Sequence, residues 1–159
     1  MDKAKMISRM ARITLDGPIE AVFPLFGPLK EKEWASGWEP RMIFSERDEM
    51  KAHTIFITDG HPPHEDHYTW IVSRYEPLNH FLEYTVFTSE RVWFITIKCV
   101  AGEILRRTFA DITYTYIGLS ELGIRLNELS LSHIFSHDLA DWEKAINHYL
   151  LTGEMLTCH

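Results

Sequence analysis

Three histidines and three carboxylates fall within nine residues in the stretch DGHPPHEDH, from Asp59 to His67. Imidazole and carboxylate groups at this density are the usual donors of transition-metal sites and of acid–base catalysis. The Pro-Pro pair inside the stretch excludes a helix that would align the histidines, and the strand-like sequences on both sides place it in a hairpin turn. His61, His64 and His67 are therefore interpreted as an exposed polar turn with only adventitious metal affinity, and no metal site is predicted.

Elsewhere the chain offers few residues in arrangements that support catalysis. The motifs GxSxG and HExxH and a glycine-rich phosphate loop are absent, which excludes the common hydrolase, zinc-protease and nucleotide-binding classes. Cys99 and Cys158 form no CxxC pair and are interpreted as reduced thiols, with Cys99 as inert packing in a strand. Glu33, His133 and His137 are the titratable residues nearest the expected interior, and each is expected to face solvent. No catalytic residue is assigned and no cofactor is predicted.

Length and charge narrow the class of protein. The 159 residues suit one domain, 1–159, with a folded core from about residue 11 to residue 153. A formal net charge of -7 without a dense basic cluster argues against nucleic acid as a partner. Charged residues interrupt every apolar run of the first fifteen residues, so neither a signal peptide nor a membrane span is predicted there. A cytoplasmic protein that is not membrane-integral is expected.

The elements that must position any site follow from a change of hydrophobic period along the chain. A strand is predicted over 11–17, followed by a helical segment that Pro24, Gly27 and Pro28 divide into two short helices. After Pro40 the period becomes two, and short polar or glycine-containing connectors separate the runs, which predicts an antiparallel meander. The six predicted strands span 41–47, 53–59, 68–75, 80–87, 91–100 and 104–117.

A long amphipathic helix is predicted near the C-terminus. The period becomes helical from about Leu119 onward, and the long segment is predicted to begin near Ser132 or Ser136, because a serine side chain accepts a hydrogen bond at a helix N-terminus. Its end is placed at Gly153. Apolar residues recur on one face, which is expected to pack on the concave side of the sheet. These residues are Phe135, Leu139, Trp142, Ile146 and Tyr149.

The alternation within the strands predicts which side chains face that helix. The inward set is Tyr68, Trp70, Val72, Leu82, Tyr84, Val86, Trp93, Ile95, Ile97, Ile112, Tyr114 and Tyr116. The opposite parity is mostly threonine and charged residues, as a solvated face should be. Four phenylalanines, Phe81, Phe87, Phe94 and Phe109, break this rule on the outer side.

This order of elements resembles the helix-grip fold of the START-like superfamily, also called SRPBCC, which includes the birch-pollen-allergen and polyketide cyclase families. Four segments carry the resemblance: EKEWASGWEP (31–40), WIVSRYEP (70–77), ITYTYIGLSELG (112–123) and DWEKAINHYLLTG (141–153). The resemblance implies an α+β fold in which a curved antiparallel sheet of about seven strands holds two short helices after its first strand and a long C-terminal helix across its concave face. It also implies a cavity for an apolar ligand between helix and sheet.

The resemblance, together with the aromatic side chains, predicts a protein that binds a small hydrophobic or amphipathic molecule, such as a lipid or an aromatic metabolite. Tyrosine hydroxyls are expected to orient the ligand. The residues predicted to line the site are Trp34, Trp38, Trp70, Tyr84, Trp93, Tyr114, Tyr116 and Trp142.

Two other functions stay open at this stage. One is a cyclase-like or dehydratase-like enzyme in the same cavity, with proton transfer by Tyr84, Tyr114 or Glu33, and it requires a titratable group that points into the pocket. The other is a chaperone-activator-like interaction module, which requires the four outward phenylalanines to form one exposed apolar patch. The same patch without a chaperone partner would indicate a homodimer.

Overall fold

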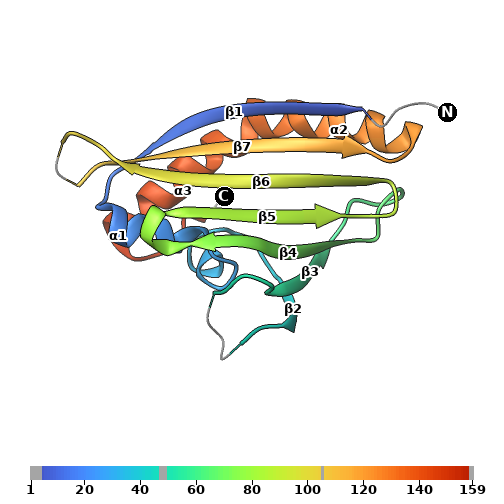
Figure 1. Cartoon of the computed structure of the whole chain (residues 1–159). Helices are drawn as coiled ribbons and strands as arrows, with labels where there is room; N and C mark the ends of the chain where they lie inside the picture. Colours follow the sequence, from blue (N-terminus) through green and yellow to red (C-terminus); the bar gives the residue numbers. More distant parts are fainter. Residues whose placement is uncertain (1–4, 47–49, 105, 158–159) are drawn as a thin grey trace.

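A curved sheet of seven antiparallel strands forms the main layer of the computed structural model, which describes residues 5–46, 50–104 and 106–157 (Figure 1). The strands lie in the order β1, β7, β6, β5, β4, β3, β2, so each strand of the meander pairs with the next and β1 pairs with the last. Their bounds are β1 (Met6–Leu15), β2 (Arg41–Phe44), β3 (Ile55–Asp59), β4 (His67–Glu76), β5 (Phe81–Phe87), β6 (Arg91–Ala101) and β7 (Thr108–Gly118).

The predicted alternation of faces is confirmed. In β7 every second residue is buried along the whole strand, and β5 and β6 follow the same rhythm. The register places Trp93 opposite Tyr116 and Ile95 opposite Tyr114, so large inward side chains lie side by side across the strands. Cross-strand neighbours of this kind are the unit of sheet stability, and here they also form the floor of the interior.

Two short helical segments follow β1, as the prolines predict. The first joins α1 (Ile19–Val22) to a 3-10 turn, η1 (Phe23–Phe26), and the second is a 3-10 turn, η2 (Lys30–Glu33). Gly27 and Pro28 separate them, because proline lacks the backbone N–H that a continuing helix needs. Phe23, Leu25 and Phe26 are buried, so these short segments close one end of the space under the sheet.

The C-terminal helix is longer than predicted, and its predicted start is wrong. It comprises α2 (Glu121–His133), a π-helical turn, η4 (Ile134–Asp138), and α3 (Leu139–Thr152). The helix begins after Ser120, whose Oγ accepts from the Gly123 N–H at 3.1 Å. The helical period that begins at about Leu119 in the sequence is confirmed by α2, in which only Gly123 and Asn127 are fully buried.

The predicted apolar face of the helix does pack on the sheet. Leu139 and Ile146 are buried, and Phe135, Trp142 and Tyr149 are partly buried against the same core. In Figure 1 the helix runs along one face of the sheet, where α2 contacts β7 and α3 contacts β1. Gly153 adopts a left-handed conformation and ends α3 as predicted. No helix within the described ranges is both long and apolar enough to cross a membrane.

Candidate functional site

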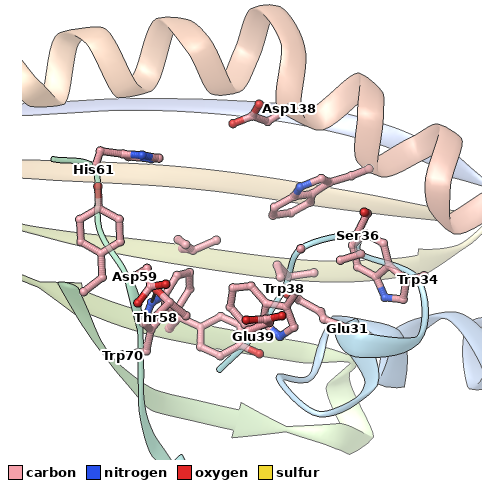
Figure 2. Close-up of a pocket in the computed structure, with 17 residues that line it drawn as sticks. Glu31, Trp34, Ser36, Trp38, Glu39, Thr58, Asp59, His61, Trp70 and Asp138 are labelled. Atoms are coloured by element: carbon pink, nitrogen blue, oxygen red, sulfur yellow. Dashed lines mark hydrogen bonds between the residues drawn. The ribbon is translucent and has the colours of Figure 1, made fainter. Parts of the chain in front are cut away.

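A cavity of about 420 Å³ lies between the sheet and the C-terminal helix. Its walls are η2 with the turn after it, the β3–β4 hairpin, the inward faces of β5 and β6, and the helix around the π turn (Figure 2). Exposed residues of the turn and the hairpin mark the mouth. The aromatic side chains of the lining are Trp34, Trp38, Tyr68, Trp70, Tyr84 and Trp142.

The aromatic rings hold one another in fixed orientations. Trp70 meets Trp38 edge to face at 5.4 Å between centroids and Tyr84 at 5.5 Å, while Trp34 meets Trp142 at 6.2 Å. Such contacts are favoured by the charge distribution of the rings. Three indole N–H groups are occupied by protein oxygens: Trp34 donates to the Leu25 carbonyl at 2.7 Å, Trp38 to the Pro28 carbonyl at 2.8 Å and Trp70 to Thr58 Oγ1 at 2.9 Å. The surface that these indoles offer to the cavity is therefore carbon and π-electron density.

A smaller chamber of about 170 Å³ adjoins the main cavity under the end of α2 and the π turn. The two spaces share lining residues, among them His61, Trp70 and Asp138. Trp93, Tyr114 and Tyr116 line the smaller chamber and not the main one. The lining thus continues from the mouth at η2 to the far end of the sheet.

Glu31 brings a carboxyl group to the wall of the main cavity. The residue is only 8% exposed, although it lies in a short polar turn. Within the described part of the chain, no hydrogen-bond donor or cation contacts its carboxylate. Burial without such a partner raises its pKa well above the usual value.

The carboxyl group of Glu31 contributes to the raised pKa values of two tyrosines. The pKa values of Tyr84 and Tyr114 are raised, first by burial and further by electrostatic repulsion that includes Glu31. The Tyr84 hydroxyl already donates to the Phe26 carbonyl at 2.7 Å. Both phenols are therefore held protonated.

Asp138 is a second carboxyl group in the lining, and it comes from the π turn. Such turns insert one extra residue into a helix and are frequent at functional sites. The pKa of Asp138 is raised by burial, and nearby histidines, including His133, His137 and His61, offset part of that rise. His133 Nε2 lies 3.3 Å from Asp138 Oδ1, so this carboxylate has a partner that Glu31 lacks.

A buried ion pair supports the far wall. Arg91 donates from Nε and Nη2 to the two carboxylate oxygens of Glu65 at 2.9 and 2.6 Å, and both side chains are almost fully buried. Its Nη1 donates to Ser130 of α2 at 2.9 Å. Burial alone would raise the pKa of Glu65, but the hydrogen bonds and charge of Arg91, with a bond from Tyr68, lower it. The pair ties the β3–β4 connection to β6 and to the helix.

Comparison with solved structures identifies the architecture, whereas no family model matches the sequence and no curated protein matches it significantly. The aromatase/cyclase ZhuI from Streptomyces sp. R1128 superposes with a TM-score of 0.73 at 8% identity, over 96% of this chain and 100% of that one. Norcoclaurine synthase from Thalictrum flavum, in complex with dopamine and hydroxybenzaldehyde, superposes with a TM-score of 0.67 at 10% identity, over 93% of this chain and 88% of that one. The chain has the helix-grip fold. The resemblance to the START-like superfamily is thereby confirmed for the architecture.

Within this helix-grip fold, the structure brings the predicted binding residues to one continuous lining. Five line the main cavity and the other three line only the smaller chamber, and their role in binding stays a prediction. Glu33 does not point toward the cavity: its carboxylate accepts from the Tyr149 hydroxyl at 2.9 Å and lies 3.5 Å from Lys30 Nζ. Cys99 is buried, and burial raises its pKa to about 12, so it stays a thiol.

Glu31 and Asp138 are the functional candidates that inspection of the strands missed. Both come from helical turns, which the alternation of the sheet does not describe. The available signal for Glu31 is its spacing from Trp34, because residues three apart share a face in a 3-10 turn. Glu33 is off that face.

The histidine-rich stretch is an exposed turn, as predicted, but it also has roles that its sequence did not indicate. His61, His64 and His67 are all exposed, whereas Glu65 is buried in the ion pair with Arg91, and His61 also lines both chambers. The stretch is polar because it anchors the hairpin and forms a wall of the cavity. Among the described residues, no group of three or more histidine, cysteine, aspartate or glutamate side chains has a geometry suited to a metal ion.

The four outward phenylalanines do not favour an interaction module. Arg12 lies over the Phe109 ring at 4.8 Å and Arg74 over the Phe81 ring at 4.6 Å. Phe94 lies between threonines of the two neighbouring strands. Charged and polar groups therefore separate these rings, which is not the single apolar patch that a chaperone-activator surface requires. A homodimer stays a prediction.

Proposed function

We propose that this protein binds a small amphipathic molecule with a flat apolar part in the cavity between the sheet and the C-terminal helix. The aromatic lining of the 420 Å³ cavity carries the proposal. A space of this size suits a small organic molecule, and burial of apolar ligand surface contributes about 25 cal/mol per Å². Because the rings already pack against one another, they lose little conformational entropy when a ligand binds.

The structural comparisons support this proposal in general terms. One similar structure, at 10% identity, contains dopamine and hydroxybenzaldehyde, and another, at 8% identity, is an aromatase/cyclase. Both proteins act on or bind small organic molecules within the same architecture. At this level of identity the shared feature is the fold, so the ligand of this chain has to be argued from its own lining.

Trp38→Ala is expected to weaken binding of an environment-sensitive apolar dye roughly fivefold, because about 1 kcal/mol of apolar contact is lost. Trp38 is partly exposed at the mouth, and it contacts Trp70 without being part of the fully buried core. The measurement is dye fluorescence in a titration, with tryptophan quenching as a second signal. Phe109→Ala, on the outer face of the sheet, is the matched control and should leave the affinity unchanged. Absence of binding by every apolar probe would refute the proposal.

A second candidate function is proton transfer in the same cavity, and Glu31 favours it. A carboxyl group with a raised pKa in an apolar lining is suited to act as a general acid or base near neutral pH. Next to an enolisable ligand, ionised Glu31 would accept the proton from the carbon beside the carbonyl. The electron pair of that C–H bond becomes the new C=C bond, and the π pair of the carbonyl moves onto its oxygen, which gives the enolate. Such a step underlies cyclase-like and dehydratase-like reactions.

Solvent exchange tests this second function directly. We expect the protein to accelerate deuterium incorporation into the methyl group of acetophenone in D₂O, followed by NMR, and Glu31→Gln to lose at least about tenfold of that acceleration. Glu33→Gln makes the same charge change two residues away and should retain it. Equal exchange rates with and without the protein would limit the function to binding.

A further inference from the structure

We propose that the ligand of the main cavity is an organic cation, an amphipathic amine whose ammonium group lies against Glu31 and whose apolar part contacts the tryptophan rings. This inference rests on the proposed function, since it names the class of molecule that the same cavity binds. The sequence predicts a lipid or an aromatic metabolite as the ligand. The present proposal differs because the positive charge of the ligand is the main source of selectivity.

The lining of the main cavity is rich in carboxyl groups. Four carboxyl groups line the main cavity, and its described lining contains no lysine or arginine. Two of the four have partners: Arg41 contacts Asp59 at 2.9 Å, and His133 contacts Asp138 at 3.3 Å. Glu31, at depth, and Glu39, at the mouth, have no cationic partner in the described part of the chain. Figure 2 shows the carboxyl groups distributed around the tryptophan rings.

The two most deeply buried carboxyl groups differ in how they are compensated. Glu65 and Glu31 are 4% and 8% exposed. Glu65 receives the bidentate guanidinium of Arg91 and a hydrogen bond from the Tyr68 hydroxyl at 2.9 Å. Glu31 receives neither, and it faces a space large enough for a ligand. A buried carboxylate is costly unless a cation or hydrogen-bond donors accompany it, and an ammonium group supplies both.

The rings around Glu31 favour the same ligand. A cation within about 6 Å of a tryptophan ring face is attracted by the electron density of that face. The N–H groups of Trp34, Trp38 and Trp70 are occupied by protein oxygens, so these rings have no donor left to stabilise an anion. The raised pKa of Glu31 agrees with this view, since it reports a carboxyl group without a cation in the unliganded protein.

Three probes that share the phenethyl group test the inference: phenethylamine, phenethyl alcohol and phenylpropionate, which are cationic, neutral and anionic. Binding to the full-length chain is measured by calorimetry, with tryptophan fluorescence as a check. We expect the amine to bind at least about tenfold more tightly than the alcohol, as a buried charge-assisted hydrogen bond would give, and the anion to bind least. Glu31→Gln should abolish the preference for the amine and retain binding of the alcohol, while Glu33→Gln should keep the preference.

Each outcome separates this inference from the proposed function. If the alcohol binds as tightly as the amine, the inference is overturned and the proposed binding function stands. If the preference for the amine survives Glu31→Gln, the assignment of Glu31 is wrong. If none of the three probes binds and an apolar dye fails as well, the proposed function itself is refuted. Far-UV circular dichroism and thermal unfolding of Glu31→Gln establish that it is folded, which is expected because the substitution removes a buried ionisable group.

Discussion

Arg91→Ala is expected to destabilise the protein by about 3 to 5 kcal/mol, because it leaves the carboxylate of Glu65 buried without its partner. The substitution removes the hydrogen bonds to both carboxylate oxygens and the bond to Ser130 of α2. It also releases the connection that carries His61, which lines both chambers. Urea unfolding at neutral pH measures the effect, and ligand affinity should fall together with stability.

An exposed pair provides the control for Arg91. Arg12 donates two hydrogen bonds to the Asp111 carboxylate at 2.7 and 2.9 Å, about as short as those from Arg91 to Glu65, but about half of the Arg12 side chain is exposed. Solvent screens such an exposed pair, so Arg12→Ala is expected to destabilise the protein much less than Arg91→Ala does. The double variant Glu65→Met with Arg91→Met should recover most of the lost stability, because apolar side chains of similar volume replace both charges. If Arg91→Ala and Arg12→Ala cost the same, the buried pair has no special role in stability.

The sheet could be predicted because its signal is local. Burial in β7 alternates at each residue from Thr108 to Gly118, and the sequence shows the matching alternation of apolar and polar residues from Ala110 to Tyr116. The connectors are too short for the crossover that parallel strands need, so they predict antiparallel pairing of successive strands. The inward face of the C-terminal helix was equally readable, since Leu139 and Ile146 recur at helical spacing.

The site was less accessible to prediction because its polar groups are set by tertiary contacts. Glu31 is buried by the packing of η2 against the sheet and helix, and nothing in the sequence KEKE separates it from exposed Glu33 except its spacing from Trp34. The sequence contains one indication of the ion pair. Arg91 shares the inward-facing side of β6 with Trp93, and a charged side chain at such a position needs a partner. That partner lies 26 residues away in the histidine-rich stretch, and only the folded structure shows it.

Glu31→Gln is expected to raise the free energy of unfolding at neutral pH by about 1 to 3 kcal/mol, since it replaces a buried ionisable group that has no partner. The sign follows from linkage. The pKa of Glu31 in the folded protein lies above the ordinary glutamate value of 4.5, so the folded state retains this proton more strongly than the unfolded state. The stability that comes from this group is therefore complete below about pH 4.5 and is lost as the pH rises through the folded pKa. Glutamine does not ionise and avoids that loss.

The difference between the variant and the wild type, followed by urea unfolding from pH 4 to pH 8, isolates this effect from other titrating groups. The lowered pKa of Glu65 and the raised pKa of Asp138 contribute equally to both proteins and cancel in the difference. Tyr84 and Tyr114, which face Glu31, stay protonated throughout. The advantage of Glu31→Gln should be small at pH 4 and should grow as the pH rises. If Glu31→Gln makes the protein more stable and abolishes its ligand preference, Glu31 is a residue that is retained for function at a cost in stability. A variant that is less stable than the wild type at neutral pH would instead show that Glu31 has a structural partner.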